Sequence, residues 1–216
     1  MQKIAIIGAT GMIGRRILME LFERSYVVTA ISRNPSELPG STLLIACEGN
    51  VLNENVVAGH VLGLENDVLI SAINPDPDDL ESFLTATLNL VKIAEKAGIK
   101  KLITVGGAGS LLLPDGRMLL ESENFPEEYK DIAMIHKRAL DIYKNLEGKK
   151  FSWINVSPAA TIAPDEKTGK YRIMTDEKVV FDAEGKSFIS AEDFASAVTD
   201  LIEDETIHNQ RVSVTY

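Results

Sequence analysis

The 216-residue sequence has little cysteine, little histidine and a deficit of basic side chains. Its single cysteine, Cys47, excludes an internal disulfide. Its three histidines are far apart in sequence and have no HxxH or HExxH spacing, so we expect no metal site. The 22 basic residues against 32 acidic ones give a formal net charge of −10, which disfavours binding to a nucleic-acid backbone.

Long apolar runs are also missing. No run approaches the roughly 20 residues that a membrane-spanning helix needs, and the first residues lack the basic and apolar regions of a signal peptide. We therefore expect a cytoplasmic protein without membrane association. Because 45% of the residues are hydrophobic, the chain can bury a large core, and we expect one domain over residues 1–216.

Short apolar runs alternate with helical patterns along the chain. This alternation is typical of an α/β fold, in which a mostly parallel sheet is covered by helices on both faces. We expect strands at 3–7, 27–32, 42–46, 68–72, 101–105 and 152–156, with a further candidate at 211–214. We expect helices at 13–24, 53–62, 80–97, 132–147 and 191–203. The order predicts a three-layer, doubly wound Rossmann fold.

Two segments, at about 111–130 and 159–190, do not fit the repeating pattern. Both follow strands, at the carboxyl ends where open α/β sheets bind ligands. Irregular segments of this length in compact domains are usually functional or disordered. We therefore predict that these two excursions form walls of a substrate site.

The first expected strand is followed by GATGMIG at residues 8–14 and then by a helix. A helix that begins directly after a strand presents unpaired N–H groups and the positive end of its dipole to an anion. Gly8 allows a tight turn, Gly11 lets a phosphate approach the backbone, and Gly14 lets the helix pack closely on the sheet. The motif predicts binding of a dinucleotide pyrophosphate.

The end of the second expected strand indicates which dinucleotide is bound. In such folds the residue there, roughly 20 positions beyond the glycines, reads the 2′ position of the adenosine ribose. An acidic residue would accept a hydrogen bond from a free hydroxyl, but this chain has Ser32 and Arg33. A guanidinium pairs with a phosphate through charge-assisted, often bidentate hydrogen bonds. We predict NADP as the cofactor, with NAD less favoured, and Arg15 could reach the same phosphate.

Several short motifs, taken in order, resemble those of the atypical short-chain dehydrogenase/reductases. The chain is most similar to their single-domain NAD(P)H-binding group, which includes flavin reductases of the biliverdin reductase B type and NmrA-like sensors. The resemblance covers almost the whole chain. The motifs that carry it are residues 8–14, 32–35, 49–51, 67–72, 105–108 and 157–159.

The resemblance implies a cofactor site that runs from the pyrophosphate to the nicotinamide. It assigns the pyrophosphate to Gly8, Thr10, Gly11, Met12 and Ile13, with Gly14 closing the motif, and the 2′-phosphate to Arg33. It places Asn50, next to Val51, beside the adenine, where family members usually carry an aspartate. It puts Ala72, Ile73 and Asn74 under the riboses, Val105 and Gly106 by the nicotinamide, and Ser157 and Pro158 on its far side.

The catalytic pair of the family is missing. Typical members carry Tyr-x-x-x-Lys, in which the lysine lowers the pKa of the tyrosine, but none of the five tyrosines here has a lysine four residues later. The serine that usually follows the fifth strand is replaced by Gly-Gly-Ala at 106–108. The remaining candidate proton donors are Ser110, Tyr129 and His136, with Lys137 at the position of the lysine. Alternatively, hydride transfer to a flavin or quinone needs no protein acid.

These observations lead to three functional hypotheses. The first is an NADPH-dependent oxidoreductase that passes hydride to a small-molecule acceptor, namely a flavin, a quinone or a conjugated carbonyl. The second is an NmrA-like binding module whose NADP occupancy alters its contact with a regulatory protein partner. An epimerase acting on a nucleotide sugar is a weaker alternative, because such enzymes are usually longer and keep the Tyr-Lys pair. The sequence does not determine the oligomeric state, and a homodimer is one alternative.

Overall fold

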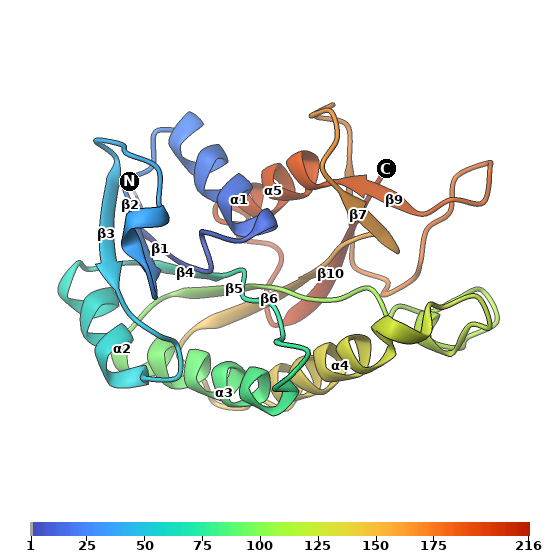
Figure 1. Ribbon diagram of the computed structural model, residues 1–216, viewed down its shortest axis with the longest axis horizontal. Helices are drawn as coiled ribbons and strands as arrows, with labels where there is room; N and C mark the ends of the chain where they lie inside the picture. Colours follow the sequence, from blue (N-terminus) through green and yellow to red (C-terminus); the bar gives the residue numbers. More distant parts are fainter. Residues whose placement is uncertain (1) are drawn as a thin grey trace.

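The computed structural model describes residues 2–216 and shows three layers, with a sheet between two sets of helices (Figure 1). The large sheet has eight strands in the order β3-β2-β1-β4-β5-β6-β10-β8. All neighbouring strands in it are parallel except β10 and β8, which are antiparallel. The predicted single-domain, doubly wound and mostly parallel Rossmann fold is confirmed.

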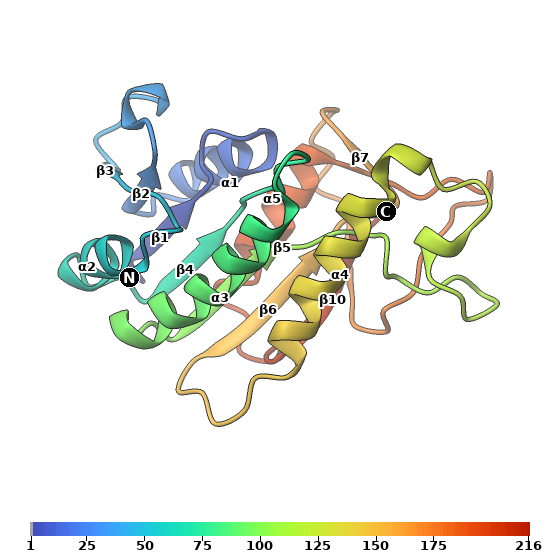
Figure 2. The same cartoon turned by 60° about the horizontal axis from the view of Figure 1, so that its bottom comes forward.

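The strands of the large sheet are β1 (Ile4–Ile7), β2 (Val28–Ser32), β3 (Leu44–Glu48), β4 (Val68–Ser71), β5 (Lys101–Val105), β6 (Ser152–Ser157), β8 (Arg172–Met174) and β10 (Gln210–Thr215). A separate parallel pair is formed by β7 (Thr161–Ala163) and β9 (Phe188–Ser190). One face of the large sheet is covered by α1 (Met12–Glu23) and α5 (Ala191–Asp200), and the other by α2 (Glu54–Gly63), α3 (Leu80–Ala97) and α4 (Lys130–Lys144) (Figures 1 and 2). No helix in residues 2–216 has the length and apolarity needed to cross a membrane.

Side chains from both faces of the central strands are buried. On the α1/α5 face, Ile17 and Phe194 pack with strand residues such as Ile6. On the opposite face, Leu90 and Tyr143 pack against the sheet. Burial on both faces explains why the central strands are continuous apolar runs in the sequence, without a polar residue at every second position.

The edge strand β3 and the helices α4 and α5 differ from the prediction by two residues or more. β3 covers 44–48, not 42–46, because a turn at Ser41, whose hydroxyl accepts from the Leu43 amide, delays its start. The helix predicted at 132–147 is α4, which begins at 130 and ends at 144, where the Asn145 side chain donates to the Asp141 carbonyl over 2.7 Å. α5 ends at 200, not 203. The ammonium of Lys101, on β5, donates to the Leu201, Ile202 and Asp204 carbonyls over 2.7–2.9 Å, and so binds the chain just after this helix.

In the second excursion (159–190), residues 164–171 lie against α1 and α5. We call this segment the strap. The buried Asp193 of α5 accepts hydrogen bonds from the amides of Thr168 and Gly169, at 3.0 and 2.8 Å, and from the Tyr216 hydroxyl. Burial alone would raise the pKa of Asp193, but these hydrogen bonds lower it overall, so the anion holds the strap in place.

Candidate functional site

A cleft of about 360 Å³ lies at the carboxyl ends of β1, β2, β3 and β4. The strand order reverses here, because β2 and β4 lie on opposite sides of β1. Open α/β sheets bind dinucleotides at such a switch point. The cleft is lined by Ile7, Gly8, Thr10, Gly11, Ile31, Ser32, Arg33, Gly49, Asn50, Val51, Leu52, Ala72, Ile73, Asn74, Asp76, Ser82, Phe83 and Ala86.

The turn between β1 and α1 has space only for glycine at two positions. Gly8 has φ of +86°, and a Cβ there would lie 2.7 Å from the backbone carbonyl of Ala72. A Cβ on Gly14 would lie 2.0 Å from the Gly8 carbonyl oxygen. The first turn of α1 therefore packs directly on the turn that precedes it. The prediction that Gly14 packs on the sheet is wrong, because its packing partner is this turn.

The amino end of α1 is open to an anion. Gly11 is its N-cap, no side chain caps this end, and its first turn holds no acidic residue. The first N–H groups of a helix have no partner within the helix, and they carry the positive end of its dipole. Gly8 and Gly11 face the cleft at this end. The geometry fits a pyrophosphate, as the sequence predicted.

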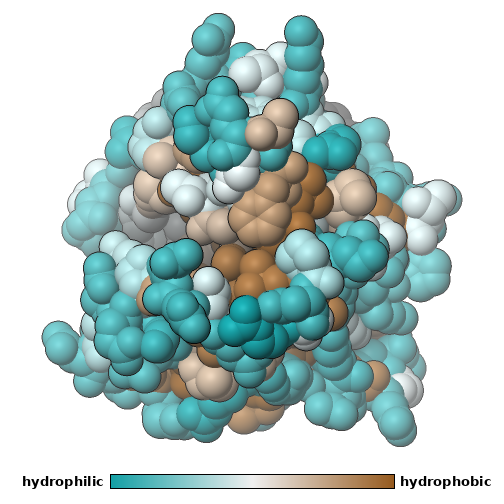
Figure 3. Space-filling model, turned by 90° about the vertical axis from the view of Figure 1, so that its right-hand side faces the viewer, coloured by the Kyte–Doolittle hydropathy of each residue, from teal (hydrophilic) through white to brown (hydrophobic). Residues whose placement is uncertain are grey.

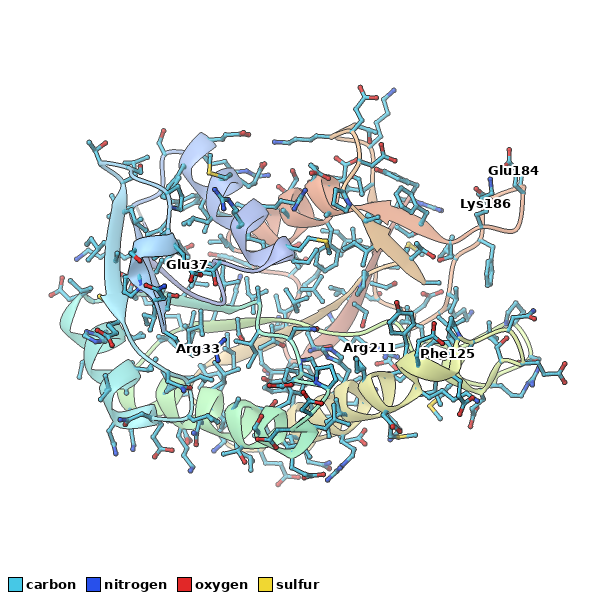
Figure 4. All side chains as sticks on the ribbon, in the orientation of Figure 1. Arg33, Glu37, Phe125, Glu184, Lys186 and Arg211 are labelled. Carbon is cyan, nitrogen blue, oxygen red and sulfur yellow. The ribbon has the colours of Figure 1, made fainter. Side chains whose placement is uncertain are left out.

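Arg33 lies at the end of β2 and lines the cleft. Its side chain is exposed and has no ion pair within residues 2–216. The turn around it is fixed by other residues: the Asn34 amide donates to the Ser32 hydroxyl over 3.2 Å, and the Asn34 side chain donates to Glu37 over 2.8 Å. Figure 4 shows Arg33 at the end of β2 on the side of α3. The guanidinium is therefore available to a phosphate in the cleft.

The cleft is lined by part of the predicted set of cofactor-binding residues and by several residues that were not predicted from the sequence. The predicted residues that do not line it are Met12, Ile13, Gly14, Arg15, Val105, Gly106, Ser157 and Pro158. Of the missed ones, Ser82, Phe83 and Ala86 come from the start of α3. The Asp79 side chain accepts from the Ser82 amide over 3.2 Å and fixes the start of this helix beside the cleft. Helical periodicity indicates the buried face of α3 but not that the start of this helix borders a cleft.

The carboxyl ends of β5 and β6 continue the site beyond this cleft. A dinucleotide that crosses the switch point would place its nicotinamide half on this side. The buried Ser157 hydroxyl donates to the Gly107 carbonyl over 2.9 Å, and the Gly106 amide donates to the Val156 carbonyl over 2.8 Å. These bonds fix the loop after β5. The predicted roles of Val105 and Gly106 beside the nicotinamide stay predictions.

The three candidate proton donors and Lys137 have four different environments, and none of them lines the cleft. The Ser110 hydroxyl accepts a hydrogen bond from Arg211 over 2.7 Å. Tyr129 is 55% exposed. Lys137 donates to Asp141 one helical turn away, over 2.7 Å. His136 packs edge-on against Phe83, with 4.9 Å between ring centroids.

Burial lowers the pKa of His136 to about 4. The ring is therefore neutral at pH 7, where it can donate a hydrogen bond but holds no imidazolium proton. The unfolded chain binds this proton near its ordinary pKa of about 6.5, so protonation favours the unfolded state as the pH falls from about 6.5 to about 4.

We therefore expect the wild-type protein to lose stability relative to His136→Gln between these pH values, by roughly 1 to 3 kcal/mol at the lower end. Urea unfolding at several pH values measures this difference. His208→Gln, at an exposed histidine, is the control and should follow the wild type. Parallel pH curves for the wild type and His136→Gln would contradict the assigned shift.

Comparison with known proteins gives the following similarities. A family model described as NAD(P)H-binding matches residues 8–205. A solved structure from Burkholderia pseudomallei, provisionally described as an exported protein, is 37% identical with a TM-score of 0.88, over 100% of both chains. One from Bacteroides thetaiotaomicron, provisionally described as an epimerase, is 32% identical with a TM-score of 0.90, over 100% of this chain and 97% of that one. One from Streptococcus pneumoniae TIGR4, provisionally described as an NADH-flavin reductase, is 29% identical with a TM-score of 0.86, over 100% and 99%.

Proposed function

The chain belongs to the NAD(P)H-binding family, and from this premise we propose that it is an NADPH-dependent oxidoreductase that transfers hydride to a flavin, a quinone or a conjugated carbonyl. The observation that carries the proposal is that an open helix amino terminus and Arg33, which has no ion pair within residues 2–216, lie along one cleft. The first fits a pyrophosphate and the second fits a 2′-phosphate. These two groups together distinguish NADP from other nucleotides.

The chain's own residues would bind and orient the cofactor. The amides at the start of α1 would hold the pyrophosphate, Arg33 the 2′-phosphate, and Asn50 an adenine edge. A reduced nicotinamide, when bound, supplies the hydride. The protein would supply orientation and a site from which water is excluded.

The class of acceptor follows from the missing catalytic pair. The sequence has no Tyr-x-x-x-Lys pair, which in typical family members gives a proton to an alkoxide. An acceptor whose reduced form takes its proton from solvent suits such a site, which favours a flavin or quinone over a simple ketone. The end of the molecule with both excursions has apolar side chains at its centre within a hydrophilic rim (Figure 3). This surface suits a flat conjugated ring, and the description of the Streptococcus structure agrees with that choice.

Turnover tests the proposal. Purified protein with NADPH is assayed against FMN, riboflavin, menadione and conjugated aldehydes by the loss of absorbance at about 340 nm. We expect turnover with at least one flavin or quinone, and faster turnover with NADPH than with NADH at equal concentration. Tight NADPH binding without turnover across the panel would contradict hydride transfer. It would favour the NADP-sensing module, which needs the cleft but no proton donor.

A further inference from the structure

A buried guanidinium lies beneath the two excursions. Arg211, on β10, has a side chain that is only 2% exposed. Arginine is rarely buried to this extent unless it is paired. Its Nη1 donates to the Ser110 hydroxyl over 2.7 Å, and its Nη2 donates to the Ser110 carbonyl over 3.1 Å. The same Nη2 lies 3.1 Å from a carboxylate oxygen of Glu177. One side chain thus joins the start of the first excursion to the second.

The two excursions also bind each other. The Leu112 amide donates to the Glu177 carbonyl and the Val179 amide donates to the Leu112 carbonyl, each over 2.9 Å. The second carboxylate oxygen of Glu177 lies 2.7 Å from the ammonium of Lys144, near the end of α4. Residues 111–112 and 177–179 therefore form one unit. Arg211 on β10 and Lys144 on α4 both bind this unit at the Glu177 carboxylate. Figure 4 shows Arg211 between α4 and the sheet, on the side where the first excursion holds Phe125.

Arg211 also binds the end of the loop at 106–110. The loop is fixed at its beginning by β6, through the Gly106 amide and the Gly107 carbonyl. Its far end, Ser110, is fixed by Arg211. Between these points the backbone of Gly107 packs against His136, because a Cβ on this glycine would lie 3.1 Å from the imidazole Cγ. The loop follows β5 directly, on the side of the switch point where the nicotinamide half falls.

We infer that Arg211 is a positioning residue for the nicotinamide and acceptor half of the site. It acts through the loop at 106–110 and the paired excursions, and at 2% exposure it does not itself contact a ligand. The inference rests on the proposed function. Arginine suits the task better than lysine, because its planar fork bonds to the hydroxyl, the carbonyl and the carboxylate in fixed directions.

A purely structural role predicts a different result. A buried ion pair often adds little to stability compared with well-packed apolar residues. If Arg211 only filled space, methionine would replace it at a cost in stability alone, and both halves of the cofactor site would keep their affinities. If it positions the loop, the halves respond differently, because a small displacement of reacting groups lowers binding and rate at that end alone.

The test compares a whole ligand with its adenosine half. Calorimetry measures the dissociation constants of NADPH and of 2′,5′-ADP, which occupies only the cleft beside Arg33. For Arg211→Met we expect the dissociation constant of 2′,5′-ADP to stay unchanged and that of NADPH to rise at least about tenfold. In turnover assays kcat should fall for the same variant, with partial recovery in Arg211→Lys. Arg172→Met, at an exposed arginine on the neighbouring β8, is the matched control and should leave every constant unchanged.

Thermal melts show whether each variant is folded. If Arg211→Met does not fold, Ser110→Ala carries the test, since it removes only the hydroxyl that Nη1 binds. It should raise the NADPH constant about threefold or more while 2′,5′-ADP binding stays as in the wild type. A folded variant that binds both ligands as the wild type does would overturn the inference. Failure of the wild type to bind either ligand would instead overturn the proposed function, and this inference with it.

Discussion

Replacing Arg33 with alanine is expected to weaken NADP binding about 10- to 150-fold and to leave NAD binding nearly unchanged. Each hydrogen bond between the guanidinium and a charged group contributes about 1.5 to 3 kcal/mol, and only NADP carries the 2′-phosphate that accepts it. Arg33 lines the cleft and is not held in an ion pair within residues 2–216. Titration calorimetry with both nucleotides measures the two losses.

Two further variants sharpen this result. Arg33→Lys keeps the positive charge without the bidentate fork, so it should retain part of the preference for NADP. Arg172→Ala is the matched control, because Arg172 is exposed on β8 and does not line the cleft, and its NADP affinity should stay close to that of the wild type. Equal losses of NADP and NAD in Arg33→Ala would remove the 2′-phosphate role from this residue.

The second large effect is expected from Gly14→Ala. A Cβ at this position would lie 2.0 Å from the Gly8 carbonyl oxygen, so the first turn of α1 must move away from the turn before it. Overpacking of this kind lowers the free energy of unfolding by about 1 to 3 kcal/mol. Because the same amides would hold the pyrophosphate, binding of NADP and NAD should both fall below detection. Urea unfolding and calorimetry on the folded variant measure the two effects.

Gly59→Ala is the control for this substitution. Gly59 lies within α2, and a Cβ there has no neighbour within 4 Å. Alanine is the better helix former by about 1 kcal/mol, so this variant should be more stable than the wild type and bind NADP equally well. Wild-type affinity in a folded Gly14→Ala protein would show that the packing of α1 on the turn is not needed for binding.

The sequence predicts best those features that depend on neighbouring residues. The turn at Gly8 and the open start of α1 follow from seven consecutive positions, and Arg33 follows from its place at the end of a strand. The Gly98 C-cap of α3, with φ of +66°, and the Asp79 N-cap of the same helix likewise depend on neighbouring residues. The alternation of apolar runs and helices is sufficient for the fold, because parallel strands with both faces covered leave continuous apolar segments.

What the sequence does not reveal depends on residues brought together from far along the chain. Lys101 binds the carbonyls that follow α5 about a hundred positions away, and so limits that helix. Arg211 reaches Ser110, which the sequence offered only as a proton donor. Asp193 holds Thr168, which places the strap on the helices and not at the strand ends. In each case a polar side chain bonds to groups far along the chain that no periodicity or motif identifies.

The central claim is that the turn after β1 and the arginine after β2 together bind NADP. Titration calorimetry of the wild-type protein with NADP and with NAD tests this most directly. The account predicts uptake of one NADP per chain, with an affinity at least about tenfold higher than for NAD. An absence of heat and of saturation with both nucleotides, in protein shown to be folded by its thermal melt, would contradict it.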